Sequence, residues 1–136
     1  MRVLIAPDKF AGTLTAVEAA EAIATGWRRH APDDELDLAP MADGGPGFLD
    51  VLHAALGGEL LAVTAEGPHG ERVPAAVLRV GDVAYVETAQ VVGLHLIDGG
   101  AEFASTTGVG ELILAAVDGG ARARSPGRSW WAGPTW

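Results

Sequence analysis

A lysine-containing loop near the start of the chain is the first place where an anion could bind. Residues 6–13 hold Lys9, the only lysine among the 136 residues, between Asp8 and Gly12. A lysine ammonium can hold a phosphate or carboxylate as a point charge, and a glycine before a helix lets backbone N–H groups approach the same anion. An ordinary strand-to-helix loop with a solvated lysine explains the same residues, so the spacing alone leaves both interpretations open.

A second loop, residues 41–47, is rich in glycine and holds Asp43, Gly44, Gly45 and Gly47. Its glycines permit positive φ and close backbone approach, so the loop could wrap an anion while Asp43 binds Mg²⁺ or accepts a proton. A tight turn in which Asp43 caps the following helix is an equally good interpretation.

A third candidate precedes a predicted helix, where Thr106, Thr107 and Gly108 form a hydroxyl-rich and glycine-rich lead. Phosphate could bind there to free N–H groups, and a plain helix cap is the alternative. Glu87 ends a predicted strand, where it could face a cleft or be solvated. The four histidines have no metal-ligand spacing among them, so we predict no histidine metal site.

Strands and helices must hold these loops, and the first of them follow a regular order. Residues 2–6 and 35–39 have the length and apolar pattern of strands. Between them, Thr15 and Glu18 have the spacing of a capping box, which predicts a helix start. The spacing of apolar residues predicts that this helix buries one stripe, made of Val17, Ala20, Ile23, Ala24 and Trp27.

A second helix is predicted over residues 48–56, with Pro46 suited to its first turn and Gly57 and Gly58 closing it. The resulting β-α-β-α order favours a parallel sheet with flanking helices over residues 1–58.

The middle of the chain has a different pattern. Residues 59–66, 71–80 and 83–87 are strand-like runs joined by turn-forming glycines, which predicts an antiparallel meander. A third helix is predicted over residues 107–118, with a buried face of Val109, Leu112, Ile113 and Ala116. The predicted fold class is therefore α/β, with a partial second α/β region at 59–121 that contains the meander and this helix.

Composition excludes several classes of function. The chain is 49% hydrophobic, has no cysteine and carries a net charge of −9. The missing cysteines exclude disulfides and thiolate catalysis, and the negative charge disfavours nucleic acid and anionic lipid as partners. Because no apolar stretch reaches the roughly 20 residues of a membrane span, we expect a cytoplasmic, soluble protein.

Residues 122–136 differ from the rest of the sequence. They contain three arginines, three tryptophans and no acid. One expectation for these residues is a disordered tail. The other is a frame-shifted reading, because reading the codons of residues 125–131 one base further along permits an apolar run that ends in two glycines.

Taken together in sequence order, the loops resemble the bacterial glycerate kinase family. The resemblance covers residues 1–121, and its motifs are Val-Leu-Ile-Ala-Pro-Asp-Lys-Phe at 3–10, Pro-Met-Ala-Asp-Gly-Gly at 40–45, Glu-Gly-Pro-His-Gly-Glu at 66–71, Glu-Thr-Ala at 87–89 and Thr-Thr-Gly-Val-Gly-Glu-Leu-Ile at 106–113. Family members are longer and have two α/β domains with the active site in the cleft between them, so the resemblance implies that this chain is an N-terminal portion.

The resemblance also implies a reaction, which is ATP-dependent phosphorylation of D-glycerate, expected at the 2-hydroxyl, with Mg²⁺. It places Asp8, Lys9, Asp43, Gly44, Gly45, Gly47, Glu87, Thr106, Thr107 and Gly108 around the cleft, with Lys9 and Asp43 as catalytic residues and Asp43 as a metal ligand.

Two positions depart from the family pattern, which has lysine in place of Ala11 and glutamate in place of Pro46. We therefore expect an incomplete and inactive portion of a kinase that exposes apolar surface and self-associates. A non-catalytic module that binds anions or regulates another protein is the alternative.

Overall fold

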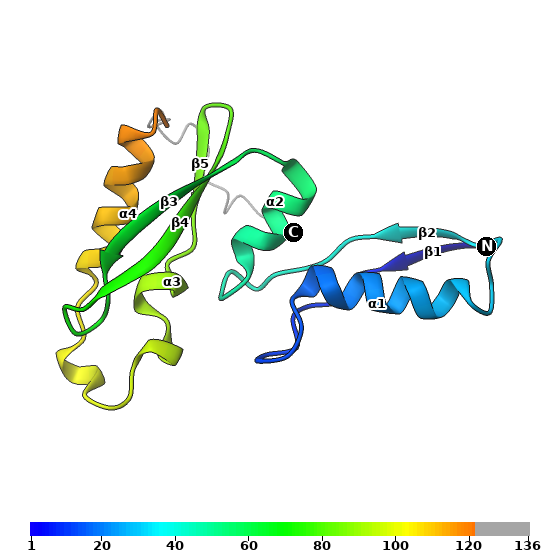
Figure 1. The fold of residues 1–136 in the computed structure, drawn as a ribbon, viewed down its shortest axis with the longest axis horizontal. Helices are drawn as coiled ribbons and strands as arrows, with labels where there is room; N and C mark the ends of the chain where they lie inside the picture. The colour runs from blue at the N-terminus through cyan, green and yellow to red at the C-terminus, as the bar shows by residue number, and fades with distance from the viewer. Residues whose placement is uncertain (122–136) are drawn as a thin grey trace, which may run out of the picture.

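The structure, a computed structural model, describes residues 1–121. Figure 1 shows β1, β2 and α1 on one side, the sheet β3-β4-β5 with α3 and α4 on the other, and α2 between them. The predicted aberrant or disordered tail at 122–136 lies outside the described residues. Among residues 1–121, no helix is long and apolar enough to cross a membrane.

The first unit is the predicted parallel pair with a connecting helix. Strand β1 (Arg2–Ile5) pairs with β2 (Glu35–Leu38), and α1 (Ala16–Arg28) joins them. The capping box is confirmed, because the Thr15 hydroxyl accepts the Glu18 N–H and the Glu18 carboxylate accepts the Thr15 N–H. Since both strands point the same way, their carboxyl ends open at the same edge.

The buried stripe of α1 differs from the predicted one. Ala20 and Ala24 are buried as predicted, but Ile23 and Trp27 are 43% and 36% exposed. Small alanine side chains let the helix lie close to a sheet that has two strands within residues 1–121, and in that part of the chain no element covers the larger side chains at the margin of the stripe. Trp27 instead donates its indole N–H to Asp34 Oδ2 at 3.0 Å.

Helix α2 (Phe48–Leu56) ends at Gly57 as predicted, and both Gly57 and Gly58 have positive φ. Its start differs, because Pro46 lies in a turn before the helix and not in its first turn. Gly47 has a φ of 92°, a left-handed conformation that interrupts helical geometry just after the proline.

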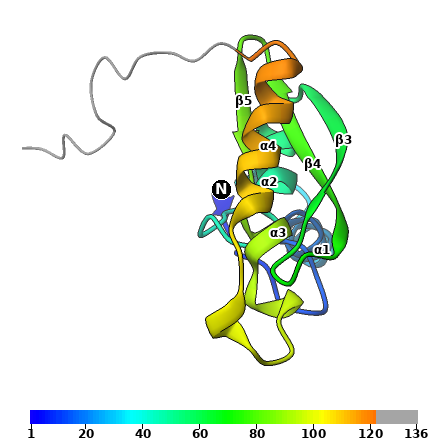
Figure 2. The ribbon, with the colours of Figure 1, turned by 90° about the vertical axis from the view of Figure 1, so that its left-hand side faces the viewer.

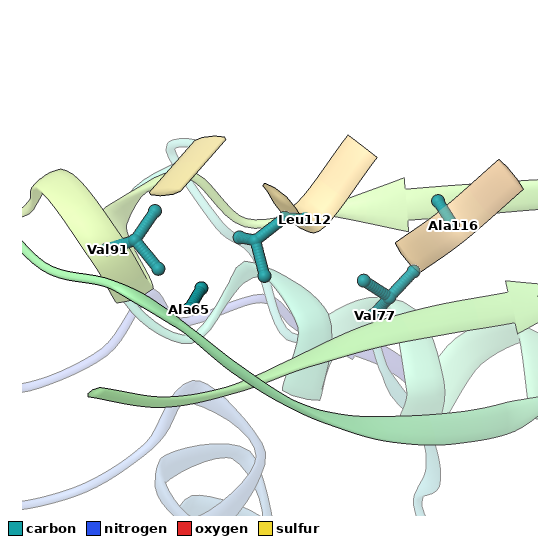
Figure 3. Packing of buried hydrophobic residues seen from close by; sticks show 5 residues of the cluster. All are labelled: Ala65, Val77, Val91, Leu112 and Ala116. Carbon is teal, nitrogen blue, oxygen red and sulfur yellow. The ribbon is translucent and has the colours of Figure 1, made fainter. Parts of the chain in front are cut away.

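The meander is confirmed, with β3 (Glu59–Glu66), β4 (Arg72–Val80) and β5 (Val83–Val86) pairing antiparallel in that order. Helix α4 (Thr107–Asp118) has the predicted bounds and lies along one face of this sheet, as Figure 2 shows. The core between them consists of Ala65, Val77, Val91, Leu112 and Ala116 (Figure 3).

One residue of the predicted α4 face was placed wrongly, because Ile113 is 53% exposed. The helix meets the sheet along Gly108, Leu112 and Ala116, which are spaced by four residues. Ile113 lies beside that line and is not among the residues packed in the core.

Between β5 and α4 the chain forms short turns that the sequence did not reveal. Helix α3 (Ala89–Val92) is a single turn, and two 3₁₀ turns follow, η1 (Leu94–Leu96) and η2 (Ala101–Phe103). A turn of three or four residues is too short to show a hydrophobic period.

Candidate functional site

The first two predicted loops meet at the carboxyl ends of β1 and β2. Backbone hydrogen bonds from Ala39 N–H to Ile5 O (2.8 Å) and from Met41 N–H to Pro7 O (2.9 Å) continue the pairing beyond the strands. A hollow of about 310 Å³ opens between the two loops and the start of α1, and its lining includes Asp8, Lys9, Gly47, Ala11 and Pro46. This is the edge at which open α/β sheets bind ligands.

An ion pair joins the two loops at this hollow. Lys9 Nζ lies 3.0 Å from Asp43 Oδ1 and 3.8 Å from Asp8 Oδ1. The Lys9 side chain is 23% exposed, whereas the Asp43 side chain is 63% exposed. The side chain of the chain's only lysine is therefore largely buried, and its ammonium group contacts an acidic side chain on the neighbouring loop.

Both charges of this pair are stabilised by their surroundings. The hydrogen bond to Asp43 raises the pKa of Lys9, and the charges of Asp43, Asp8 and Glu87 act in the same direction. The Gly45 N–H, followed by Lys9, lowers the pKa of Asp43. At neutral pH Lys9 is thus a cation and Asp43 a carboxylate, so neither is suited to exchange a proton near that pH.

Asp43 does not cap α2, which answers one question that the sequence left open. Its Oδ1 accepts the Gly45 N–H at 2.9 Å, within its own loop. The N-cap position of α2 is Gly47, which has no side chain to offer. The cap comes from far along the chain instead, because Glu87 accepts the N–H groups of Gly47 and Leu49 at 3.2 and 3.0 Å.

Glu87 is thus buried against the start of α2 and lines neither the hollow at Lys9 nor an exposed cleft surface. It is 6% exposed and is the only buried charged residue among residues 1–121. Gly44 and Gly45 do not line the first hollow but a second one of about 500 Å³, whose lining includes Thr88 and His95.

The third predicted loop lies apart from the other two. Thr106, Thr107 and Gly108 line neither hollow, and in Figures 1 and 2 the start of α4 lies beyond α3 from the loop that holds Lys9. The Thr107 N–H donates to Ser105 Oγ at 3.1 Å, and Gly108 packs against the backbone of Glu66. Residues 1–121 therefore bring Asp8, Lys9, Asp43 and Gly47 together and leave the threonine loop separate.

No cluster of three or more histidine, aspartate or glutamate side chains suited to a metal ion occurs within residues 1–121. Among the residues that the structure describes, no group donates a hydrogen bond to Asp43 Oδ2, and Asp8 is half exposed nearby. Mg²⁺ is commonly held by one or two carboxylates together with substrate phosphates, and these two aspartates fit that modest requirement.

Sequence reasoning missed Gln90 and the cap that Glu87 makes. The Glu87 cap spans 38 and 40 residues of sequence, and Gln90 contacts Ala76, 14 residues earlier. No local spacing signals a contact of this length.

Comparison with known proteins places this geometry in context. The model of the glycerate kinase family matches residues 3–124. The chain is 42% identical over 123 residues to a glycerate kinase of Halalkalibacterium halodurans, covering 87% of this chain and 32% of that protein. It is 36% identical over 126 residues to the glycerate 2-kinase of Escherichia coli, covering 89% and 33%.

A solved structure agrees with these matches. The crystal structure of putative glycerate kinase 2 from Salmonella typhimurium LT2 superimposes with a TM-score of 0.71 at 36% identity, covering 88% of this chain and 33% of that one. The chain thus spans about a third of the length of the relatives it matches. Over that third, the sequence motifs, the family model and the fold agree, and the chain belongs to the glycerate kinase family.

Proposed function

We propose that this chain supplies one wall of a glycerate kinase site, in which the γ-phosphate of ATP passes to the 2-hydroxyl of D-glycerate. The observation that carries this proposal is the Lys9–Asp43 pair at the carboxyl ends of β1 and β2, where Lys9 lines the first hollow and Asp43 lies at its edge on the neighbouring loop. The names of the relatives from Halalkalibacterium halodurans and Escherichia coli, a glycerate kinase and a glycerate 2-kinase, support it.

In this proposal Lys9 acts as a fixed cation. Its raised pKa keeps it charged, so it attracts the glycerate carboxylate or a phosphate oxygen and does not act as a base. Asp43 orients the Lys9 ammonium through their 3.0 Å contact. When Mg²⁺ is bound it neutralises charge on the phosphate oxygens, and Asp43 with Asp8 would hold it.

We expect the isolated chain to show no turnover. Ala11 and Pro46 line the hollow, where the family pattern has a lysine and a glutamate. Phosphoryl transfer depends on positioning and charge neutralisation, so the loss of a cation and an acid removes much of what drives it. The test is ³¹P NMR of the chain with ATP, Mg²⁺ and D-glycerate, with the Halalkalibacterium halodurans enzyme as positive control.

That assay also identifies the product, because 2- and 3-phosphoglycerate give separate signals. Turnover by the isolated chain at about 1 s⁻¹ or faster, within the usual range for enzymes, would contradict the expected inactivity. Formation of 3-phosphoglycerate by the chain would contradict the proposed position of transfer.

A second candidate function is a non-catalytic module that binds anions, and Ala11 and Pro46 in the hollow favour it. This candidate predicts that D-glycerate or inorganic phosphate binds in the absence of ATP and that Lys9→Ala abolishes binding. Arg28→Ala is the matched control, because it removes one positive charge from the last turn of α1, outside the lining of the hollow.

The variant Ala11→Lys separates the two candidates further. It adds a cation to the hollow and should tighten phosphate binding, while turnover stays absent if the rest of the site is needed for chemistry. If neither anion binds to the original chain in calorimetry, or if Lys9→Ala binds as the original chain does, the module candidate is wrong.

A further inference from the structure

Helix α2 begins beside the hollow that Lys9 lines, yet the residue at its N-cap position cannot cap it. The first N–H groups of a helix lack partners within the helix, and a side chain at the N-cap usually accepts them. Gly47 occupies that position and has no side chain, and its φ of 92° is a conformation that favours glycine. The start of α2 therefore depends on a group from elsewhere.

Glu87 is that group, and it is bound at both carboxylate oxygens. Oε1 accepts the Gly47 N–H at 3.2 Å and Oε2 accepts the Leu49 N–H at 3.0 Å. A carboxylate at a helix N-terminus also interacts favourably with the helix dipole. A charge buried to 6% exposure is costly unless it is hydrogen-bonded in this way, so the contact fixes α2 and Glu87 relative to each other.

Gln90 fixes Glu87 in turn. The pairing of β4 with β5 ends at Val77 and Val86, which leaves Ala76 as the next β4 residue. The Gln90 side-chain amide occupies the place of a strand partner there, accepting the Ala76 N–H at 2.8 Å and donating to the Ala76 carbonyl at 3.2 Å. Because the Gln90 N–H also donates to Glu87 O at 3.2 Å, the turn that carries Glu87 is tied to the sheet.

The same contacts continue to the Lys9–Asp43 pair. Gly45 lies two residues before Gly47, and its N–H holds Asp43 Oδ1, which is the atom that faces Lys9 Nζ. We infer that Glu87, held by Gln90, is a positioning residue that fixes the loop at residues 44–47 and thereby sets Asp43 opposite Lys9. This inference rests on the proposed function only for the importance of that pair.

The test uses the full chain and reads the environment of Lys9 without any substrate. Reductive methylation with ¹³C-formaldehyde labels Lys9 and the N-terminal amine alone, because the chain has no other lysine. The pH titration of the Lys9 methyl signal then gives its pKa, to which Asp43, Asp8 and Glu87 contribute. Amide exchange of Gly47 and Leu49 reports the cap separately.

Gln90→Met is the main variant, since methionine is similar in size and cannot make the paired hydrogen bonds with Ala76. It keeps the charge of Glu87, so a lower Lys9 pKa would report a displaced Asp43 and not a lost charge. We expect that lower pKa together with roughly tenfold faster exchange of the Gly47 and Leu49 amides, as for the loss of a helix cap. Glu87→Gln, the second variant, removes the capping carboxylate directly and should speed exchange of the same two amides. Its control is Glu102→Gln, which removes an exposed acid from η2 and should change neither readout.

An unchanged Lys9 pKa and unchanged exchange in a folded Gln90→Met variant would overturn the inference. If neither variant folds, exchange in the original chain decides. We expect the amides of Gly47, Leu49 and Ala76 to share one opening free energy, and opening of Gly47 and Leu49 independent of Ala76 would overturn it. Failure of the kinase assay leaves these readouts intact, so the two proposals fail separately.

Discussion

Replacing Gly108 by alanine tests why a glycine stands at the start of α4. A Cβ built at this position would lie 1.9 Å from the Glu66 carbonyl oxygen and 3.1 Å from Val91 Cβ. The oxygen belongs to the backbone of β3 and cannot rotate away. The helix would have to move, but Glu111 ties it to β3 by accepting the Glu66 N–H at 2.8 Å.

The expected cost follows from two opposing effects. Forcing extra volume into a packed site typically costs about 1–3 kcal/mol, and alanine offsets at most about 1 kcal/mol through its better helix propensity. We expect a net loss of about 2 kcal/mol, which lowers Tm by roughly 5–10 °C in a domain of this size. Thermal melts and urea titrations followed by circular dichroism measure both values.

Gly110→Ala is the matched control, because it makes the same chemical change two residues further along the same helix. Gly110 is exposed, and a Cβ there meets no atom within 4 Å. The control should therefore gain up to about 1 kcal/mol from helix propensity. Equal stability of the two variants would refute the packing role of Gly108 and restore its role in binding phosphate as the better explanation.

Three further predictions concern other parts of the chain. The hydrogen bonds of Arg72, followed by the Glu66 N–H, lower the pKa of Glu111. The contribution of Glu111 to the free energy of unfolding is therefore present above the ordinary glutamate pKa and is lost as pH falls below that value. Urea titrations between pH 6 and pH 3 should show a steeper loss of stability for the original chain than for Glu111→Gln, and parallel curves would contradict this. Thr15→Ala removes a cap and should cost about 1 kcal/mol, whereas Thr25→Ala within the same helix should cost nothing, and equal melts would contradict the role of the cap. Resequencing the gene should reveal a second reading frame that continues the family sequence after about residue 121, and a confirmed frame ending at Trp136 with no such continuation would rule out the frame shift.

The sequence predicts the helices and strands of this fold where local chemistry determines them. The Thr15–Glu18 capping box marks the start of α1, and the glycines after Leu56 mark the end of α2, because these signals act over a few residues. Ile23 and Ile113 were placed wrongly because periodicity indicates the direction of a stripe and not its width. The width depends on how much sheet lies opposite, which only the assembled structure shows.

The candidate site was predictable in part for the same reason. The parallel order of β1 and β2 brings their two loops to one edge, and the structure places Lys9 beside Asp43 there. The contribution of Glu87 was not predictable from spacing, because its two hydrogen bonds cross from the meander to α2. Contacts of this kind depend on tertiary structure, and a single sequence carries no local signal for them.

The position of Glu87 also changes what a glycine-rich loop means in this chain. Such a loop before a helix can bind phosphate only if its N–H groups are free. Here Glu87 accepts the Gly47 and Leu49 N–H groups, and Asp43 accepts that of Gly45. These donors are already used by the chain's own carboxylates, and among residues 1–121 Lys9 is the only cationic side chain that lines the hollow, so we expect Lys9 to be the main attraction for an anion there. The net charge of −9 makes that single cation more important, because the surrounding field repels the ligand that Lys9 is proposed to hold.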